Sequence, residues 1–129
     1  MFLMILLTAV SCDIYSPDAY YSVTNLSEDS VYFFATYADS TKCGPIGEMI
    51  PAYSHPDALL APNETCDGLE VWDFNYYKAR RLYVFFFRKS TVDNAGWDYL
   101  REKDSCDARY DFTLDDLKSI NYRIIYRNQ

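Results

Sequence analysis

LYVFFF, residues 82–87, is the segment that decides the fold, because all six side chains are apolar or aromatic. Such residues favour β-strands, and a strand that is apolar on both faces belongs inside a sheet that is covered on both sides. Basic residues flank the segment at Arg80, Arg81, Arg88 and Lys89. We interpret them as gatekeepers that keep an apolar strand from pairing with other chains. The sequence therefore predicts a buried sheet built around this strand.

Other segments rich in aromatic and β-branched residues predict further strands. These segments are Ala19–Thr24, Val31–Tyr37, Leu69–Phe74, Tyr122–Arg127 and a short one at Glu48–Ala52. The first two are separated only by the polar turn at residues 25–30, so we expect them to form a hairpin.

Two helices are expected near the C-terminus. Residues 93–103 (DNAGWDYLREK) predict one short helix that Asp93 or Asn94 caps. Thr113 is expected to cap a second helix by accepting a hydrogen bond from the backbone N–H of Asp116. The elements together predict a mostly β fold, an antiparallel β-sandwich with one or two short helices near the C-terminus. An α+β sheet with the helices packed on one face is the alternative.

The length, composition and net charge of the chain indicate which kind of protein it is. The chain has 129 residues, which is one ordinary domain, and half of its residues are apolar, which is too many for a disordered chain. Its formal net charge of −7 repels phosphate backbones, so nucleic acid is not an expected partner.

The N-terminus has the pattern of an export signal. Phe2–Val10 is an apolar run that is too short to span a bilayer, which needs about 20 residues, but it matches the apolar part of a signal peptide. The sequence Ala9-Val10-Ser11-Cys12 then resembles a bacterial lipobox, which implies cleavage before Cys12 and lipidation of its thiol. A plain cleaved signal, or a short strand with a buried cysteine, is the alternative. We therefore expect a signal peptide at 1–12, a tether at 13–18 and a single domain at 19–129.

Several motifs resemble those of a family of small lipoproteins from Bacteroides-type gut bacteria that has no assigned biochemical activity. The similar segments are the 82–87 strand, Trp97 in a helix, Arg109–Leu117 (RYDFTLDDL), Asn121–Tyr126 (NYRIIY) and Asn25–Tyr37. The similarity covers residues 20–37 and 82–126. It implies export and a lipid anchor in the bacterial cell envelope, which we expect on the periplasmic or surface face of the outer membrane. The family has no established biochemical role to carry over, and we expect a protein that is not an enzyme and uses no cofactor.

The cysteines remaining after Cys12 suggest a disulfide in an oxidising compartment. Cys43 and Cys66 flank a proline-rich segment, so we predict that they pair and that Cys106 is left over, while other pairings stay open. His55 is the only histidine, and a small hydrolase that uses it with a cysteine or an acid is a remote hypothesis. The spacing of cysteine and histidine gives no zinc motif.

Two further groups of side chains are candidate ligand sites. Trp72, Tyr76 and Tyr77, with Tyr53, supply the aromatic rings of a sugar-binding or small-ligand surface. Asp111, Asp115 and Asp116 could form an acidic ligand site, although helix capping accounts for the same residues. The main hypothesis is a non-catalytic lipid-anchored protein that acts by contact with proteins or surfaces. A carbohydrate- or small-ligand-binding lipoprotein is the alternative.

Overall fold

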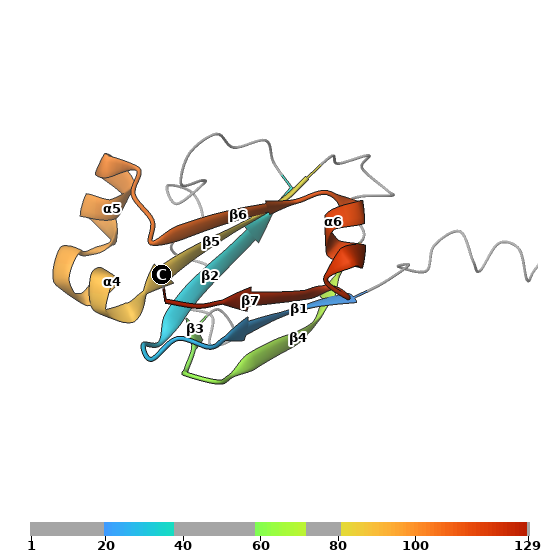
Figure 1. Ribbon diagram of the computed structural model, residues 1–129. Coiled ribbons are helices and arrows are strands. Elements are labelled where there is room, and N and C mark those ends of the chain that lie inside the picture. The colour runs from blue at the N-terminus through green and yellow to red at the C-terminus, as the bar shows by residue number, and fades with distance from the viewer. Residues whose placement is uncertain (1–19, 38–58, 72–80, 129) are drawn as a thin grey trace, which may run out of the picture.

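The computed structural model describes residues 20–37, 59–71 and 81–128. Within these ranges the chain forms seven strands and three helices, which Figure 1 labels. The strands are β1 (Tyr20–Asn25), β2 (Val31–Thr36), β3 (Leu59–Leu60), β4 (Thr65–Glu70), β5 (Leu82–Arg88), β6 (Ala108–Phe112) and β7 (Arg123–Tyr126). The helices are α4 (Lys89–Ala95), α5 (Trp97–Lys103) and α6 (Leu114–Ser119).

The strands form two sheets (Figure 1). Sheet A has the order β4-β1-β7, and sheet B has the order β3-β2-β5-β6. Every pair in sheet B is antiparallel, whereas in sheet A β1 is antiparallel to β4 and parallel to β7. The prediction of a mostly β fold with helices near the C-terminus is confirmed. The parallel β1–β7 pair is the one departure from the expected antiparallel pairing within the described residues.

The main core lies between the two sheets. It takes alternate side chains from both, among them Val23 of β1, Ile124 and Tyr126 of β7, and Val84 and Phe86 of β5. The rings of Phe86 and Tyr126 stack across the core with centroids 4.7 Å apart. The side-chain alternation of each strand therefore fixes which face it turns toward the opposite sheet.

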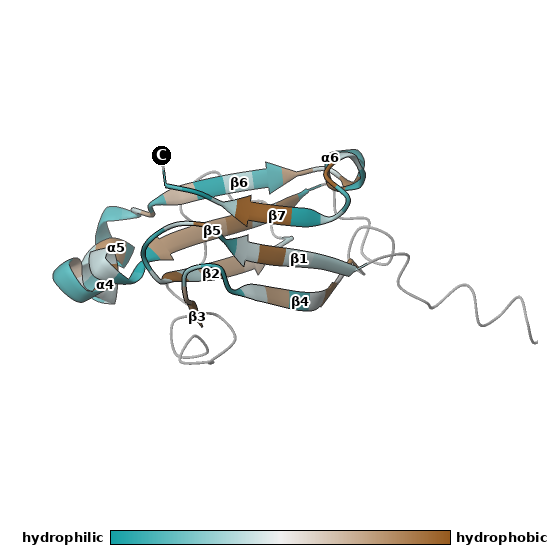
Figure 2. Cartoon of the chain, turned by 60° about the horizontal axis from the view of Figure 1, so that its bottom comes forward, coloured by the Kyte–Doolittle hydropathy of each residue, from teal (hydrophilic) through white to brown (hydrophobic). Residues whose placement is uncertain are grey.

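A second cluster covers the other face of sheet B. Phe85 and Phe87 of β5 pack there with Val92 of α4 and Leu100 of α5. The Trp97 ring lies edge-on to Phe87, with centroids 5.2 Å apart. Figure 2 shows the apolar strands β2 and β5 beside the largely hydrophilic helices α4 and α5. Residues 82–87 are thus buried on both faces and lie between β2 and β6, as the sequence predicted.

The predicted single helix over residues 93–103 is wrong. Two helices meet at Gly96, whose φ of 79° and ψ of 151° interrupt the helical path. The first helix begins at Lys89, directly after β5, so Asp93 and Asn94 lie inside α4 instead of capping a helix. Glycine alone adopts this backbone region readily, which explains why the break falls there.

The predicted hairpin of the first two strands is also wrong, because β1 belongs to sheet A and β2 to sheet B. The fully buried side chain of Asn25 stabilises the crossing. Its Nδ2 donates to the backbone oxygens of Asp29 and Leu60, at 2.8 and 3.0 Å. Its Oδ1 accepts from the backbone N–H of Ser27 at 2.9 Å and from the Ser27 hydroxyl at 2.6 Å. This network turns the chain away from a local hairpin.

Other boundaries differ in detail. The strand expected at Leu69–Phe74 is β4, which begins at Thr65, and residues 72–74 lie outside the described ranges. β3 and β6 were not predicted as strands. The leader at 1–12, the tether at 13–18 and the strand expected at Glu48–Ala52 lie outside the described residues.

Candidate functional site

The two sheets end side by side at the strands β6 and β7. β6 is an edge of sheet B and β7 is an edge of sheet A. Only α6 and its flanking residues connect them along the chain, so both edges lie on the same side of the sandwich (Figure 1). Edge strands present backbone groups and side chains to a partner, which makes this side the first place to look for a binding surface.

The α6 connection is built by a capping box. The Thr113 hydroxyl accepts from the backbone N–H of Asp116 at 3.1 Å, and the Asp116 carboxylate accepts from the backbone N–H of Thr113 at 2.9 Å. Leu117 is fully buried against the main core. Asn121 and Tyr122 then adopt positive φ angles of 54° and 58°, which reverse the chain into β7. The predicted cap at Thr113 is confirmed.

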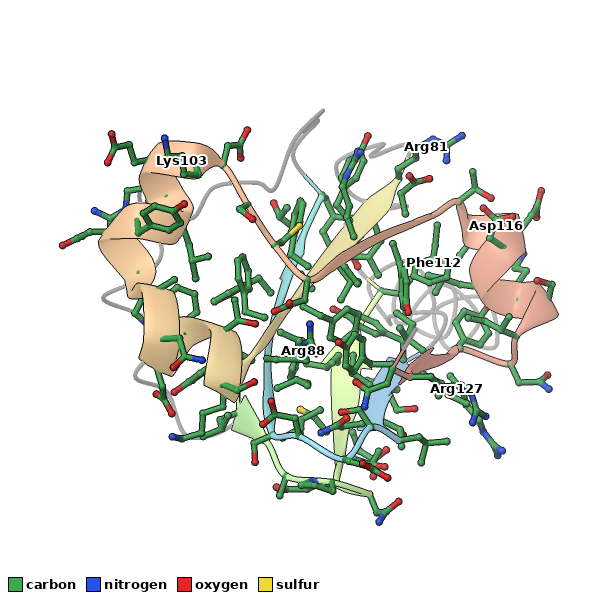
Figure 3. The ribbon with its side chains drawn as sticks, turned by 60° about the vertical axis from the view of Figure 1, so that its left-hand side comes forward. Arg81, Arg88, Lys103, Phe112, Asp116 and Arg127 are labelled. Atoms are coloured by element: carbon green, nitrogen blue, oxygen red, sulfur yellow. The ribbon has the colours of Figure 1, made fainter. Side chains whose placement is uncertain are left out.

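An open groove of about 690 Å³ runs between β6 and β7 and ends at the turn after α6. Its apolar lining includes Phe112 of β6, Ile120 after α6 and Ile124 of β7. Asp111, Asn121 and Arg123 add polar groups. Phe112 projects from the end of β6 toward this space (Figure 3). The arrangement suits an apolar or extended ligand that polar groups orient at the rim.

Tyr110, which lines the groove, contacts a set of aromatic rings in the core beneath it. Phe86 lies between Tyr110 and Tyr126, with ring centroids at 5.3 and 4.7 Å. Burial raises the pKa of the Tyr110 phenol above its ordinary value, and burial together with the nearby Asp107 charge raises the pKa of Tyr126. Both phenols therefore stay protonated at neutral pH and serve as hydrogen-bonding groups rather than bases.

A polar cluster lies at the other end of the two edge strands. The Asp107 carboxylate accepts from the backbone N–H of Arg88 at 2.6 Å, from the Arg88 guanidinium at 3.2 Å and from the Thr91 hydroxyl at 3.0 Å. A small pocket of about 60 Å³ lies here, lined also by Tyr126 and Arg127. The carboxylate joins the end of β5, the start of α4 and the approach to β6. Arg88, interpreted from sequence as a gatekeeper, is thus a structural ion-pair partner.

Two of the three acidic residues considered as a ligand site have separate contacts, and the third, Asp115, is an exposed residue in the first turn of α6. Asp111 pairs with Arg81, and Asp116 belongs to the capping box. Hydrogen bonds from Thr113 lower the pKa of the Asp116 carboxyl, and the Arg81 charge acts in the same direction. Within the described ranges, no group of three or more histidine, cysteine or acidic side chains could hold a metal ion. The contacts favour the helix-capping interpretation.

The predicted disulfide between Cys43 and Cys66 is wrong as regards Cys66. Cys66 is a thiol, half-buried on β4, where it packs against the main core between the sheets. Cys106, which was expected to be left over, is disulfide-bonded. The strand position of Cys66 turns its side chain toward the sheet interface, a long-range effect that cysteine spacing does not reveal.

The remaining sequence candidates lie outside the described residues. They are the lipidation candidate Cys12, the disulfide candidate Cys43, His55, and the aromatic residues Tyr53, Trp72, Tyr76 and Tyr77. The groove between β6 and β7 was missed by sequence reasoning. Alternation of Tyr110 with Phe112 and of Ile124 with Tyr126 was visible, but a local pattern does not say which strands become edges.

Comparison with protein-family models, with curated proteins and with solved structures finds no match to this chain. Among the helices that the structure describes, none has the length and apolar character required to cross a bilayer.

Proposed function

We propose that this chain is a non-catalytic, lipid-anchored protein of the bacterial cell envelope that acts through contacts with proteins or surfaces. The observation that carries the proposal is the sequence Ala9-Val10-Ser11-Cys12, which overlaps the end of the apolar run Phe2–Val10. Small residues before a cysteine suit cleavage by a signal peptidase, and the cysteine sulfur is the site of thioether attachment to the lipid. Acyl chains supply the membrane affinity, and two or more make the attachment stable.

The position of the domain is consistent with this anchor. The first described strand begins at Tyr20, eight residues after Cys12, so a short polar segment separates the lipid from the folded domain. The charged side chains of Asp107 and Asp116 hold elements of the fold together. These two carboxylates therefore stabilise the fold.

Fractionation of the native host tests the proposal. The full chain is expected in the membrane fraction and to enter the detergent phase on detergent partitioning. Cys12→Ala is expected to lose both behaviours, because it removes the only atom to which the lipid is attached. Cys66→Ala is the matched control, since it removes another thiol and leaves the lipobox intact. Equal membrane association of the Cys12→Ala variant would contradict the anchor.

A second candidate is a lipoprotein that binds a small ligand. It is favoured by the groove between β6 and β7, whose volume of about 690 Å³ falls in the range typical of ligand sites, about 300–1,000 Å³. Nile red, a neutral apolar dye, provides the probe. Saturable binding that Ile120→Asp abolishes and Leu26→Asp retains would support a ligand site, because Ile120 lines the groove and Leu26 is exposed elsewhere. Unsaturable binding, or equal binding by both variants, would exclude it.

A further inference from the structure

The chain enters the domain at the same end that carries α6. Tyr20 is the first residue of β1 and lies opposite Glu70, the last residue of β4. Two residues later, Ser22 lies opposite Arg123, the first residue of β7. Because α6 and its turn lead directly into β7, the entry point and α6 share one end of the sandwich (Figure 1). We name this end, which carries Tyr20 and α6, the entry end.

The helices α4 and α5 lie at the opposite end. β1 finishes at Asn25, which lies opposite Tyr126 at the end of β7. α4 follows the last residue of β5, and the backbone N–H of Lys89 donates to the oxygen of Ser30 in the turn after β1, at 2.7 Å. Figure 3 shows Lys103 of α5 and Asp116 of α6 on opposite sides of the molecule. We name this second end, formed by α4, α5 and the 26–30 turn, the helical end.

We propose that the anchor holds the domain with the entry end against the lipid headgroups and the helical end directed away from the membrane. This inference rests on the proposed lipidation of Cys12. It adds to that proposal which end of the domain contacts the lipid.

The lengths of the tether and the domain decide the orientation. Cys12 and Tyr20 are eight residues apart, and a fully extended chain of that length spans about 28 Å at most. The six residues of β1 extend about 20 Å at the usual rise of a strand, and a helix with its side chains adds about 10 Å. The outer surface of α5 is therefore about as far from Tyr20 as the extended tether can reach. An inverted domain, with the helical end on the lipid and Tyr20 farthest from it, would require a fully stretched tether, which conformational entropy opposes.

The entry end has a side chain that suits a lipid surface. Tyr20 is 54% exposed, although most large apolar and aromatic residues of the described chain are covered. Tyrosine has an apolar ring and a polar hydroxyl, and such rings concentrate at the level of the lipid headgroups. Lys118 and Arg123 are exposed near the same end, and the exposed Asp115 and Asp116 of α6 balance their charges, so the Tyr20 ring and the tether carry the assignment. The partner that this end fits is a phospholipid headgroup surface.

The helical end carries a similar set of exposed side chains. Tyr99 of α5 is 52% exposed, and the Lys103 ammonium lies 6.0 Å from the centre of its ring. Asp98, Arg101 and Glu102 on the same helix are also exposed. The helical end therefore has an exposed tyrosine among charges of both signs, as the entry end does, so the length of the tether distinguishes the two ends.

Fluorescence quenching in vesicles tests the orientation. A fluorescent amino acid is incorporated at Lys118 of α6 or at Glu102 of α5 in the full-length chain, which is matured in its host and reconstituted. The vesicles carry a nitroxide on the lipid headgroup, and vesicles without nitroxide are the control. The label at Lys118 is expected to lose emission, and the label at Glu102 is expected to keep it. Tyr20→Ser tests the aromatic contact and is expected to reduce the loss at Lys118.

The intact mass of each sample separates the two proposals. Equal loss at both positions, or a greater loss at Glu102, in a chain that carries acyl mass would overturn the orientation and leave the anchor standing. A chain without acyl mass that stays off the vesicles would overturn the anchor, and the orientation with it.

Discussion

The buried side-chain amide of Asn25 donates a hydrogen bond to the backbone oxygen of Leu60 at 3.0 Å. This bond joins the end of β1 in sheet A to β3 in sheet B. The same amide nitrogen donates to Asp29, and the amide oxygen accepts two hydrogen bonds from Ser27. One side chain thus satisfies the backbone groups of a turn in which the chain leaves one sheet for the other.

Asn25→Ala is expected to destabilise the domain by about 3 kcal/mol, because it leaves several buried polar groups without partners. Urea unfolding measures the loss. Asn94→Ala is the matched control, since Asn94 is exposed on α4, and its free energy of unfolding is expected to change by less than about 0.5 kcal/mol. Similar effects of the two substitutions would contradict the role assigned to Asn25.

Gly96→Ala tests the break between α4 and α5. Gly96 has φ 79° and ψ 151°, a region that residues with a Cβ rarely enter, and nothing lies within 4 Å of the added Cβ. The expected cost is therefore backbone strain of about 1–3 kcal/mol and not a steric clash. Chemical unfolding measures this cost, and circular dichroism reports any change in helix content. A variant as stable as the parent chain would mean that the break does not depend on glycine.

Thr113→Ala is expected to lower the free energy of unfolding by about 1 kcal/mol, because it removes the hydroxyl that caps α6. Thr113→Ser keeps the hydroxyl and is expected to retain most of the stability. The two variants should be compared by chemical unfolding at the same pH. If they lose equal stability, then the hydroxyl does not act as a cap.

The Asp116→Asn variant tests how the stabilisation by the same cap depends on pH. The pKa of Asp116 is lower in the folded chain than its ordinary value because Thr113 donates hydrogen bonds to the carboxylate. The stabilisation is therefore fully present above the unfolded-state pKa of about 3.9 and is lost as pH falls through the lower folded-state pKa. Asp116→Asn is expected to be less stable than the parent chain at pH 6, with the difference shrinking in strong acid. A difference that grows as the pH falls would contradict this assignment.

The disulfide of Cys106 provides an independent check on the anchor. Cys66 is a thiol and Cys106 is disulfide-bonded. If lipid occupies the sulfur of Cys12, as proposed, then we predict that Cys106 pairs with Cys43. Peptide mapping without reduction is expected to find a peptide that links Cys43 to Cys106, together with an alkylated Cys66. A peptide that links Cys12 to Cys106 would contradict lipidation, because the same sulfur cannot form both bonds.

Local sequence patterns predicted the elements whose causes are local. The all-apolar run at residues 82–87 identified a strand buried on both faces, and the spacing of Thr113 and Asp116 identified the cap of α6. The β1–β2 hairpin failed because Asn25 bonds to Leu60, which is 35 residues away in the chain. The prediction of one continuous helix was wrong because Gly96 interrupts the helical pattern of the residues around it.

The groove between β6 and β7 could not be predicted from the sequence, for a related reason. Whether β6 and β7 are edge strands depends on the pairing of every other strand, including the parallel contact of β1 with β7. The contacts of Cys66 could not be predicted for the same reason. They depend on the position of Cys66 on β4 and not on its spacing from Cys43. Sequence reasoning therefore identified strands and caps but not the surface they create.

The intact mass of the protein extracted from its native membranes tests the central claim most directly. The account predicts a chain that begins at Cys12 and carries the added mass of acyl chains, and it predicts that Cys12→Ala lacks this mass. An unmodified chain that retains Met1 would contradict the account, because residues 1–12 would then belong to the mature protein and the membrane anchor would not exist.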